Sequence, residues 1–186
     1  ELWGKTVLVV GFGRVGRRTA LRCAAFDMRV IVADPYVAHQ EVEALGYRYV
    51  ADFRDALAEA DFVTLHLPGG PAQGAVMGTA EFTKMKAGAY FVNVARGTLV
   101  DEEALVDALT SGHLRGAGLD VMRQEPPAPD SPLLELQNVV LSPHSAALTE
   151  ECIRRMSVVS VQNILDALDG RLNPDFVVNK EVLGSV

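Results

Sequence analysis

The chain has 186 residues, a hydrophobic fraction of 49% and a formal net charge of −7. This length supports one good hydrophobic core, and the negative charge argues against nucleic acid as a direct ligand. The two cysteines, Cys23 and Cys152, lack the spacing of a metal site, so we expect at least partly buried thiols, no bound metal and a reducing, cytoplasmic compartment.

The first predicted strand, residues 7–10, runs into the pattern Gly11-x-Gly13-x-x-Gly16 and then into a predicted helix over residues 14–26. In a dinucleotide-binding turn the first glycine permits the turn, the second lets backbone approach a pyrophosphate, and the third lets the helix pack on its strand. The helix N-terminus adds unpaired N–H groups and the positive end of its dipole. The pattern therefore predicts a dinucleotide site, with an ordinary glycine-rich turn as the alternative.

The second predicted strand, residues 29–33, ends at Asp34, which lies eighteen residues after Gly16. A carboxylate at this place accepts hydrogen bonds from both hydroxyls of the adenosine ribose and repels the extra phosphate of NADP. The next residues, Pro35 and Tyr36, offer no arginine to hold that phosphate. NAD is therefore the expected cofactor.

Residues 62–80 form the longest stretch without Asp, Glu, Lys or Arg. Pro68 and Pro71 interrupt this stretch, as do the two glycines between them. A membrane-spanning helix needs a longer uninterrupted apolar run, so we expect a strand followed by a loop and no membrane partner.

Helix and strand patterns alternate along the chain, which predicts an α/β fold with a doubly wound parallel sheet of the Rossmann type. Thr79 and Asp101 are predicted N-caps. A long helix with an apolar stripe is predicted from Thr149 to about Leu168, ending at Gly170. Further predicted strands are 62–66, 89–93, 116–120 and 139–141, with a short extended segment at 47–50, and further predicted helices are 38–45, 54–59, 80–85 and 102–110.

Three polar residues follow predicted strands: Arg96, Glu125 and His144. In open parallel sheets the ligand lies beyond the carboxyl ends of the strands. Each residue alone has an ordinary explanation: an arginine paired with a surface acid, a solvated loop glutamate, and a histidine that caps a helix or sits satisfied in the core. Together they form a set with complementary chemistry at the edge where a nicotinamide ring is expected.

The chain resembles the NAD-dependent D-2-hydroxyacid dehydrogenases, a family that includes D-3-phosphoglycerate dehydrogenase and hydroxypyruvate reductase. The resemblance implies an oxidoreductase that transfers a hydride between NAD(H) and a small D-2-hydroxy acid or 2-oxo acid. The motifs that carry it follow the family's order over almost the whole chain: GKT (4–6) with GFGRVG (11–16), ADP (33–35), LHLP (65–68), MKAGA (85–89), VNVARGTLVDEEAL (92–105), GLDVMRQEP (118–126) and PH (143–144).

The resemblance also implies a role for each site residue. Arg96, Glu125 and His144 are the implied catalytic residues. The implied cofactor contacts are Gly11, Gly13 and Gly16 in the turn, Arg14 and Val15 at the pyrophosphate, Asp34 at the adenosine ribose, Leu67 and Pro68 beside the adenine, Val94 and Ala95 near the nicotinamide, Asp120 at its carboxamide, and Arg96 and His144 beside the same ring.

In the implied mechanism, protonated His144 gives a proton to the carbonyl oxygen as the hydride arrives from NADH. In the oxidative direction, neutral His144 accepts the hydroxyl proton. Glu125 would orient the imidazole and favour its cationic form. Arg96 would hold the substrate carboxylate and polarise the carbonyl group.

Two places depart from the family's pattern. Gly69-Gly70-Pro71 stands where bulkier residues are commoner, which is expected to loosen the loop on the adenine side. Ser145 follows the histidine where the family often has an apolar residue, which leaves the surroundings of the nicotinamide less defined.

The resemblance covers a cofactor domain and implies a longer protein. We expect residues 1–148 to form the NAD-binding domain, 149–170 a connecting helix, and 171–186 a tail of a mostly absent substrate domain. Because the chain begins with Glu1 and reaches its first strand almost at once, we expect a fragment, although N-terminal processing would look the same. Such a fragment is expected to bind NAD but to turn over poorly, and to pair as a homodimer through the cofactor domain.

Two other functions use the same motifs. An NAD-sensing binding protein like the C-terminal-binding-protein corepressors shares the fold and the same Arg, Glu and His. A phosphite dehydrogenase-like enzyme would use another hydride donor. The identity of the 2-hydroxy acid stays open, because the residues that select its side chain are expected in the other domain.

Overall fold

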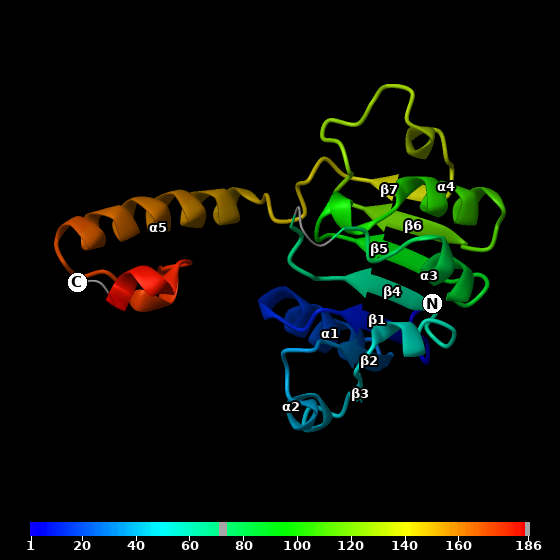
Figure 1. The fold of residues 1–186 in the computed structure, drawn as a ribbon, viewed down its shortest axis with the longest axis horizontal. Helices are drawn as coiled ribbons and strands as arrows, with labels where there is room; N and C mark the ends of the chain where they lie inside the picture. The colour runs from blue at the N-terminus through cyan, green and yellow to red at the C-terminus, as the bar shows by residue number, and fades with distance from the viewer. Residues whose placement is uncertain (71–73, 185–186) are drawn as a thin grey trace. The chain divides into compact units, whose positions relative to one another are not determined.

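The fold was obtained as a computed structural model, which describes residues 1–70 and 74–184. Its centre is a parallel seven-stranded sheet with the order β3-β2-β1-β4-β5-β6-β7 (Figure 1). The strand order reverses between β1 and β4, where a doubly wound sheet opens its ligand crevice at the carboxyl ends of the strands. The predicted fold class is confirmed.

The element bounds match most of the predicted ones. The strands are β1 Thr6–Val10, β2 Arg29–Ala33, β3 Arg48–Val50, β4 Phe62–Leu65, β5 Tyr90–Asn93, β6 Gly116–Leu119 and β7 Val139–Leu141. The helices are α1 Arg14–Ala25, α2 His39–Glu43, α3 Thr79–Lys84, α4 Glu102–Thr110 and α5 Glu150–Leu168, with 3₁₀ turns η1 Phe53–Asp55, η2 Gly97–Leu99, η3 Pro132–Leu134, η4 Pro174–Phe176 and η5 Lys180–Gly184.

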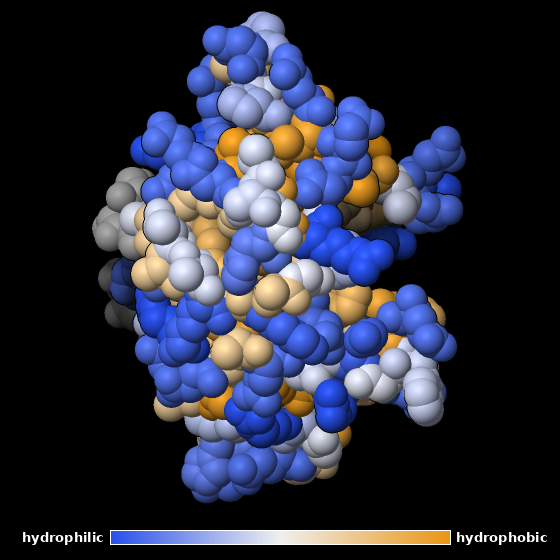
Figure 2. Space-filling model, turned by 90° about the vertical axis from the view of Figure 1, so that its right-hand side faces the viewer, coloured by the Kyte–Doolittle hydropathy of each residue, from blue (hydrophilic) through white to orange (hydrophobic). Residues whose placement is uncertain are grey.

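Strand β1 is buried on both faces, because successive side chains point to opposite sides of the sheet. Val7 and Val9 pack in a cluster with Ala20 of α1 and Val42 of α2. The alternate β1 side chains join the larger cluster that includes apolar residues of α3 and α4. The face shown in Figure 2 is mainly hydrophilic, with apolar side chains gathered in smaller areas.

Two predictions about helices are wrong. The segment 54–59 forms only the short η1 turn, because the Asp52 side chain accepts the N–H of Arg54 and favours a tight local turn. Thr79 is the first helical residue of α3 and not its N-cap. The carboxylate of Glu81 accepts the N–H of Gly78 at 3.1 Å, which places the helix start one residue earlier.

The predicted cap of α4 is confirmed. Asp101 is the N-cap, and its side chain accepts hydrogen bonds from the N–H groups of Glu103 and Ala104. Two backbone donors at the helix start are thereby satisfied.

Residues 1–144 and 145–186 form two compact units. In the second unit, α5 begins after Thr149, whose hydroxyl accepts the N–H of Cys152 at 3.1 Å. The predicted apolar stripe of α5 is exposed, and the helix buries none of its residues. No helix in residues 1–70 and 74–184 is long and apolar enough to cross a membrane.

Candidate functional site

Of the three glycines at the turn between β1 and α1, two have no room for a side chain. A Cβ on Gly11 would lie 2.6 Å from the carbonyl oxygen of His66, and the φ angle of Gly11 is +93°. A Cβ on Gly16 would overlap the carbonyl oxygen of Gly11. A Cβ on Gly13 would meet open space, so this backbone is accessible to a ligand. The turn has the form that lets a pyrophosphate approach.

Helix α1 starts directly after this open glycine and presents its N-terminus to the same place. Gly13 has no side chain to cap the helix, and the first turn contains no acidic residue. Arg14 and Val15 are exposed there. The N–H groups of the first turn and a neighbouring guanidinium suit a phosphate group.

Asp34 lies at the end of β2 with its carboxylate fixed by backbone groups. One oxygen accepts the N–H of Phe12 at 2.7 Å, and the other accepts the N–H of Tyr36 at 2.8 Å. Asp34 is only 8% exposed. Each carboxylate oxygen can accept a second hydrogen bond, so both remain able to receive the two ribose hydroxyls.

Phe12, which holds Asp34, is itself held by Arg17. The Nε of Arg17 donates to the carbonyl of Phe12 at 3.1 Å, and its guanidinium carbon lies 4.7 Å from the centre of the Phe12 ring. A second nitrogen of Arg17 donates to Glu41 of α2 at 2.8 Å. The sequence did not identify this support, because it joins residues from three elements.

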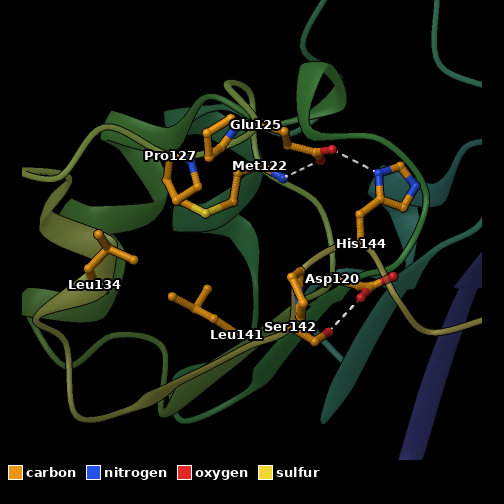
Figure 3. A pocket seen from close by; sticks show the side chains of 10 residues that line it. Asp120, Met122, Glu125, Pro127, Leu134, Leu141, Ser142 and His144 are labelled. Atoms are coloured by element: carbon orange, nitrogen blue, oxygen red, sulfur yellow. Dashed lines mark hydrogen bonds and ion pairs between the residues drawn. The ribbon is translucent and has the colours of Figure 1, made fainter. Parts of the chain in front are cut away.

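Glu125 and His144 meet at the carboxyl edge of β6 and β7 (Figure 3). Nδ1 of His144 lies 2.8 Å from one oxygen of Glu125, and the other oxygen accepts the N–H of Met122 at 3.0 Å. These two hydrogen bonds, first that of His144 and then that of Met122, hold the pKa of Glu125 below its ordinary value. Because a carboxylate only accepts, Nδ1 carries a proton, and Nε2 takes no part in this contact.

The backbone also positions His144. Its N–H donates to the carbonyl of Asp120 at 2.8 Å, and its φ angle is +52°, in the left-handed region. The hydroxyl of Ser142 donates to the Asp120 carboxylate at 2.5 Å. Asp120, the residue that follows β6, thus fixes the histidine through its main-chain carbonyl and has its carboxylate bonded to Ser142.

A cavity of about 440 Å³ lies beside the Glu125–His144 pair. Figure 3 shows the polar pair on one side and apolar side chains of Met122, Leu134 and Leu141 on the other. Such a wall keeps water away from one side of an acid–base pair, which strengthens its electrostatic interactions. The lining residues are Asp120, Met122, Glu125, Pro126, Pro127, Leu134, Leu141, Ser142, Pro143 and His144.

Arg96 lies at the end of β5, and the structure does not bond it to the other two predicted catalytic residues. Its Nη1 donates to the carbonyl of Ala95 at 2.6 Å. Asn93, which is 1% exposed, donates to the carbonyl of Arg96 and accepts the N–H of Ala95. Within residues 1–70 and 74–184, no carboxylate pairs with the Arg96 guanidinium, so its charge is available to an anionic ligand.

The other predicted contact residues also lie at strand ends. Leu67 and Pro68 follow β4, and Val94 and Ala95 follow β5, the neighbouring strand. Ala95 is 6% exposed, so it contributes mainly through its backbone. Of the departing loop residues, Gly69 and Gly70 are described and Pro71 lies outside the described residues.

His66, a partly buried residue at this edge, has no separate role in the sequence analysis. Burial lowers its pKa to about 4, so the imidazole is neutral at physiological pH. Its Nε2 lies 3.1 Å from the hydroxyl of Thr64, and its buried Nδ1 has no hydrogen-bond partner among the described residues. The sequence signal for His66 as a residue of this site was its position directly after β4.

The observed donors and acceptors fit a dinucleotide better than a metal. The open backbone at Gly13, the free α1 N-terminus and the fixed Asp34 carboxylate match pyrophosphate and ribose in turn. In the described part of the chain, no three His, Cys, Asp or Glu side chains are arranged to hold a metal ion.

Comparison with protein families gives one match that spans most of the chain. Residues 1–146 match the family model described as "D-isomer specific 2-hydroxyacid dehydrogenase, NAD binding domain". The chain is 46% identical to a D-3-phosphoglycerate dehydrogenase of Mycobacterium leprae, over 98% of this chain and 35% of that protein. It is 39% identical to a glyoxylate reductase of Korarchaeum cryptofilum, over 98% of this chain and 54% of that protein.

Solved structures show the same fold. The structure of D-lactate dehydrogenase with NAD⁺ from Lactobacillus jensenii superposes with a TM-score of 0.86 at 32% identity, covering 96% of this chain and 57% of that one. The chain therefore spans 35% of the length of the mycobacterial relative and 57% of the chain of the D-lactate dehydrogenase structure.

Proposed function

The chain belongs to the D-isomer specific 2-hydroxyacid dehydrogenase family, and we propose that it is the NAD-binding part of an enzyme that interconverts a small D-2-hydroxy acid and its 2-oxo acid. The observation that carries this proposal is the 2.8 Å contact between His144 and Glu125 at the carboxyl edge of the sheet. Acid–base chemistry at an alcohol carbon needs such an oriented imidazole beside the nicotinamide.

NAD is the cofactor, because the family model that the chain matches is an NAD-binding domain. Its nicotinamide supplies or accepts the hydride when it is bound. The residues of this chain hold the rest of the molecule: the Gly13 backbone and the α1 N-terminus receive the pyrophosphate, and Asp34 receives the ribose. The Asp34 carboxylate disfavours the additional phosphate of NADP.

His144 exchanges the proton. In reduction, its Nε2–H gives a proton to the substrate oxygen, and in oxidation neutral Nε2 accepts the hydroxyl proton. Glu125 accepts a hydrogen bond from Nδ1–H throughout, which fixes the ring and stabilises the imidazolium. Positioned acid–base catalysis of this kind is worth roughly 10²–10⁴-fold in rate.

Arg96 binds the carboxylate of the substrate. Its guanidinium follows β5 at the same edge and has no acidic partner within residues 1–70 and 74–184. A charge-assisted contact to the carboxylate would orient the neighbouring carbonyl group toward the acid and the cofactor. Asp120, whose carboxylate accepts a hydrogen bond from the Ser142 hydroxyl, would receive the nicotinamide carboxamide.

The substrate-selecting half belongs to sequence beyond this chain. The mycobacterial relative is nearly three times as long as the part that matches, which supports a further domain over the crevice. We place residues 149–170 as the connecting helix and 171–186 as the start of a return to that domain. Pairing of two copies through the cofactor domain and a cytoplasmic location complete the proposal.

Replacement of His144 by Ala tests the acid–base role. In the full-length protein, His144→Ala should lower kcat by roughly 10²-fold or more, while the dissociation constant of NADH measured by fluorescence stays close to that of the wild type. His113→Gln is the matched control, because the ring of His113 contacts the carbonyl of Met85, and these residues precede β6 and β5, at the opposite end of the strands from the site. Unchanged turnover of His144→Ala would remove His144 from proton exchange.

A further inference from the structure

The loops that follow β4 and β5 meet at Gly69 and Arg96. The two strands are parallel neighbours, and Leu65 of β4 pairs with Asn93 of β5. Gly69 comes four residues after one member of this pair and Arg96 three residues after the other. The two residues thus reach the same point of the sheet edge.

The Arg96 side chain fills the space that a side chain on residue 69 would need. A Cβ built on Gly69 would lie 2.5 Å from the Cβ of Arg96, closer still to its Cγ, and 3.5 Å from Oγ1 of Thr98. Cβ and Cγ are the stem of the arginine, so rotation of its outer bonds cannot relieve the overlap. Relief requires another χ1 rotamer of Arg96 or a movement of backbone.

The backbone of Arg96 is held on both sides. The buried side chain of Asn93 bonds the carbonyl of Arg96 at 2.9 Å and the N–H of Ala95 at 3.0 Å. On the other side, a Cβ on Gly97 would overlap the backbone carbonyl of Met122, so the chain is packed tightly there. A side chain at residue 69 would therefore displace the arginine stem or its own loop.

We propose that Gly69 is a positioning residue for Arg96. The missing side chain at residue 69 gives the arginine stem the room in which its guanidinium points to the substrate carboxylate, and this sets the affinity for that carboxylate. The inference rests on the proposed role of Arg96.

Gly70 supplies a matched control, because a Cβ on Gly70 would meet nothing within 4 Å. Gly69→Ala and Gly70→Ala make the same chemical change on adjacent residues of one loop. Binding of oxamate, an unreactive 2-oxo acid analogue, to the full-length protein with NADH bound should weaken by roughly tenfold or more in Gly69→Ala. Gly70→Ala should bind oxamate like the wild type, and both variants should keep the wild-type affinity for NADH.

A double-mutant cycle with Arg96→Ala separates positioning from a general loop effect. Once Arg96 is removed, the additional change Gly69→Ala should weaken oxamate binding no further. An undiminished effect of Gly69→Ala in that background, or wild-type oxamate binding by Gly69→Ala alone, would overturn the inference. If Arg96→Ala itself left oxamate binding unchanged, the proposed role of Arg96 would be wrong, which is a distinguishable failure.

Discussion

At the scale of single residues, the Glu125–His144 contact determines the proposed chemistry. The two side chains are 40% and 49% exposed, so water and salt screen the contact in this part of the protein. The contact is therefore mainly geometric: it selects the tautomer of His144 and leaves Nε2 outside the pair, as the proposed proton exchange requires. Exclusion of water by a covering domain would strengthen the same contact.

Replacement of Glu125 by Gln should move the alkaline limb of the reductive pH–rate profile to lower pH. An amide has no charge to stabilise the imidazolium, so the active protonated form is lost earlier as the pH rises. The measurement is kcat/KM for reduction across the neutral and alkaline range in the full-length protein. Glu135→Gln, in an exposed position after η3, serves as control.

The behaviour of the Glu125–His144 contact at low pH follows from the lowered pKa of Glu125. A group whose pKa is lowered in the folded protein stabilises the folded state at pH values above its ordinary pKa. This contribution is lost as the pH falls through the lowered pKa. The carboxylate thus stays charged through the range in which the enzyme would work. If the pH–rate profile of Glu125→Gln were identical to that of the wild type, Glu125 would be an ordinary loop residue.

At the scale of elements, the site depends on where helices begin. Helix α1 begins at Arg14 without a side-chain cap, so its N-terminus stays available to a phosphate. Helix α4 begins at Glu102 after a full side-chain cap by Asp101. The start of α1 is thus without a side-chain cap, whereas the start of α4 is capped by the protein itself.

Replacement of Asp101 by Ala should destabilise the fold by about 1 kcal/mol, because two backbone N–H groups of α4 lose their acceptor. The free energy of unfolding is measured by urea denaturation. Thr79→Ala is the matched control: Thr79 is the first helical residue of α3, so its loss removes no cap. Equal destabilisation by both changes would contradict the capping role of Asp101.

At the scale of the whole molecule, the chain is a cofactor module with an exposed helix. Helix α5 buries none of its residues, although Ile153, Met156 and Leu165 lie on its apolar stripe. A long helix of this kind normally gains its stability by packing its apolar face. The relatives are longer than this chain, which supports a partner segment for the helix in the full protein.

The 186-residue chain should bind NADH with an affinity close to that of the full-length protein but reduce 2-oxo acids far more slowly. Its glycine turn and Asp34 are complete, whereas the side chains of Glu125 and His144 are 40% and 49% exposed. NADH fluorescence and NADH oxidation with glyoxylate or hydroxypyruvate measure the two properties. Normal steady-state turnover by the 186-residue chain would contradict the expectation that this chain binds NADH but reduces 2-oxo acids slowly.

The sequence by itself determined the features that depend on local spacing. The alternation of apolar runs gave the doubly wound sheet, the glycine pattern placed the turn, and Asp101 gave the start of α4. Polar residues at strand ends marked Glu125 and His144, because parallel strands bring their carboxyl ends to one edge. Short-range backbone geometry and strand topology suffice for all of these.

The tertiary structure alone decided the contacts between residues far apart in the chain. Ser142 bonds Asp120 across two strands, Arg17 joins the glycine turn to α2, and Gly69 lies against Arg96. Spacing along one segment holds no information on such contacts, since they depend on the register and close packing of neighbouring strands. The wrong helix over 54–59 has a different origin, because the short-range bond from the N–H of Arg54 to the Asp52 side chain favours a turn there.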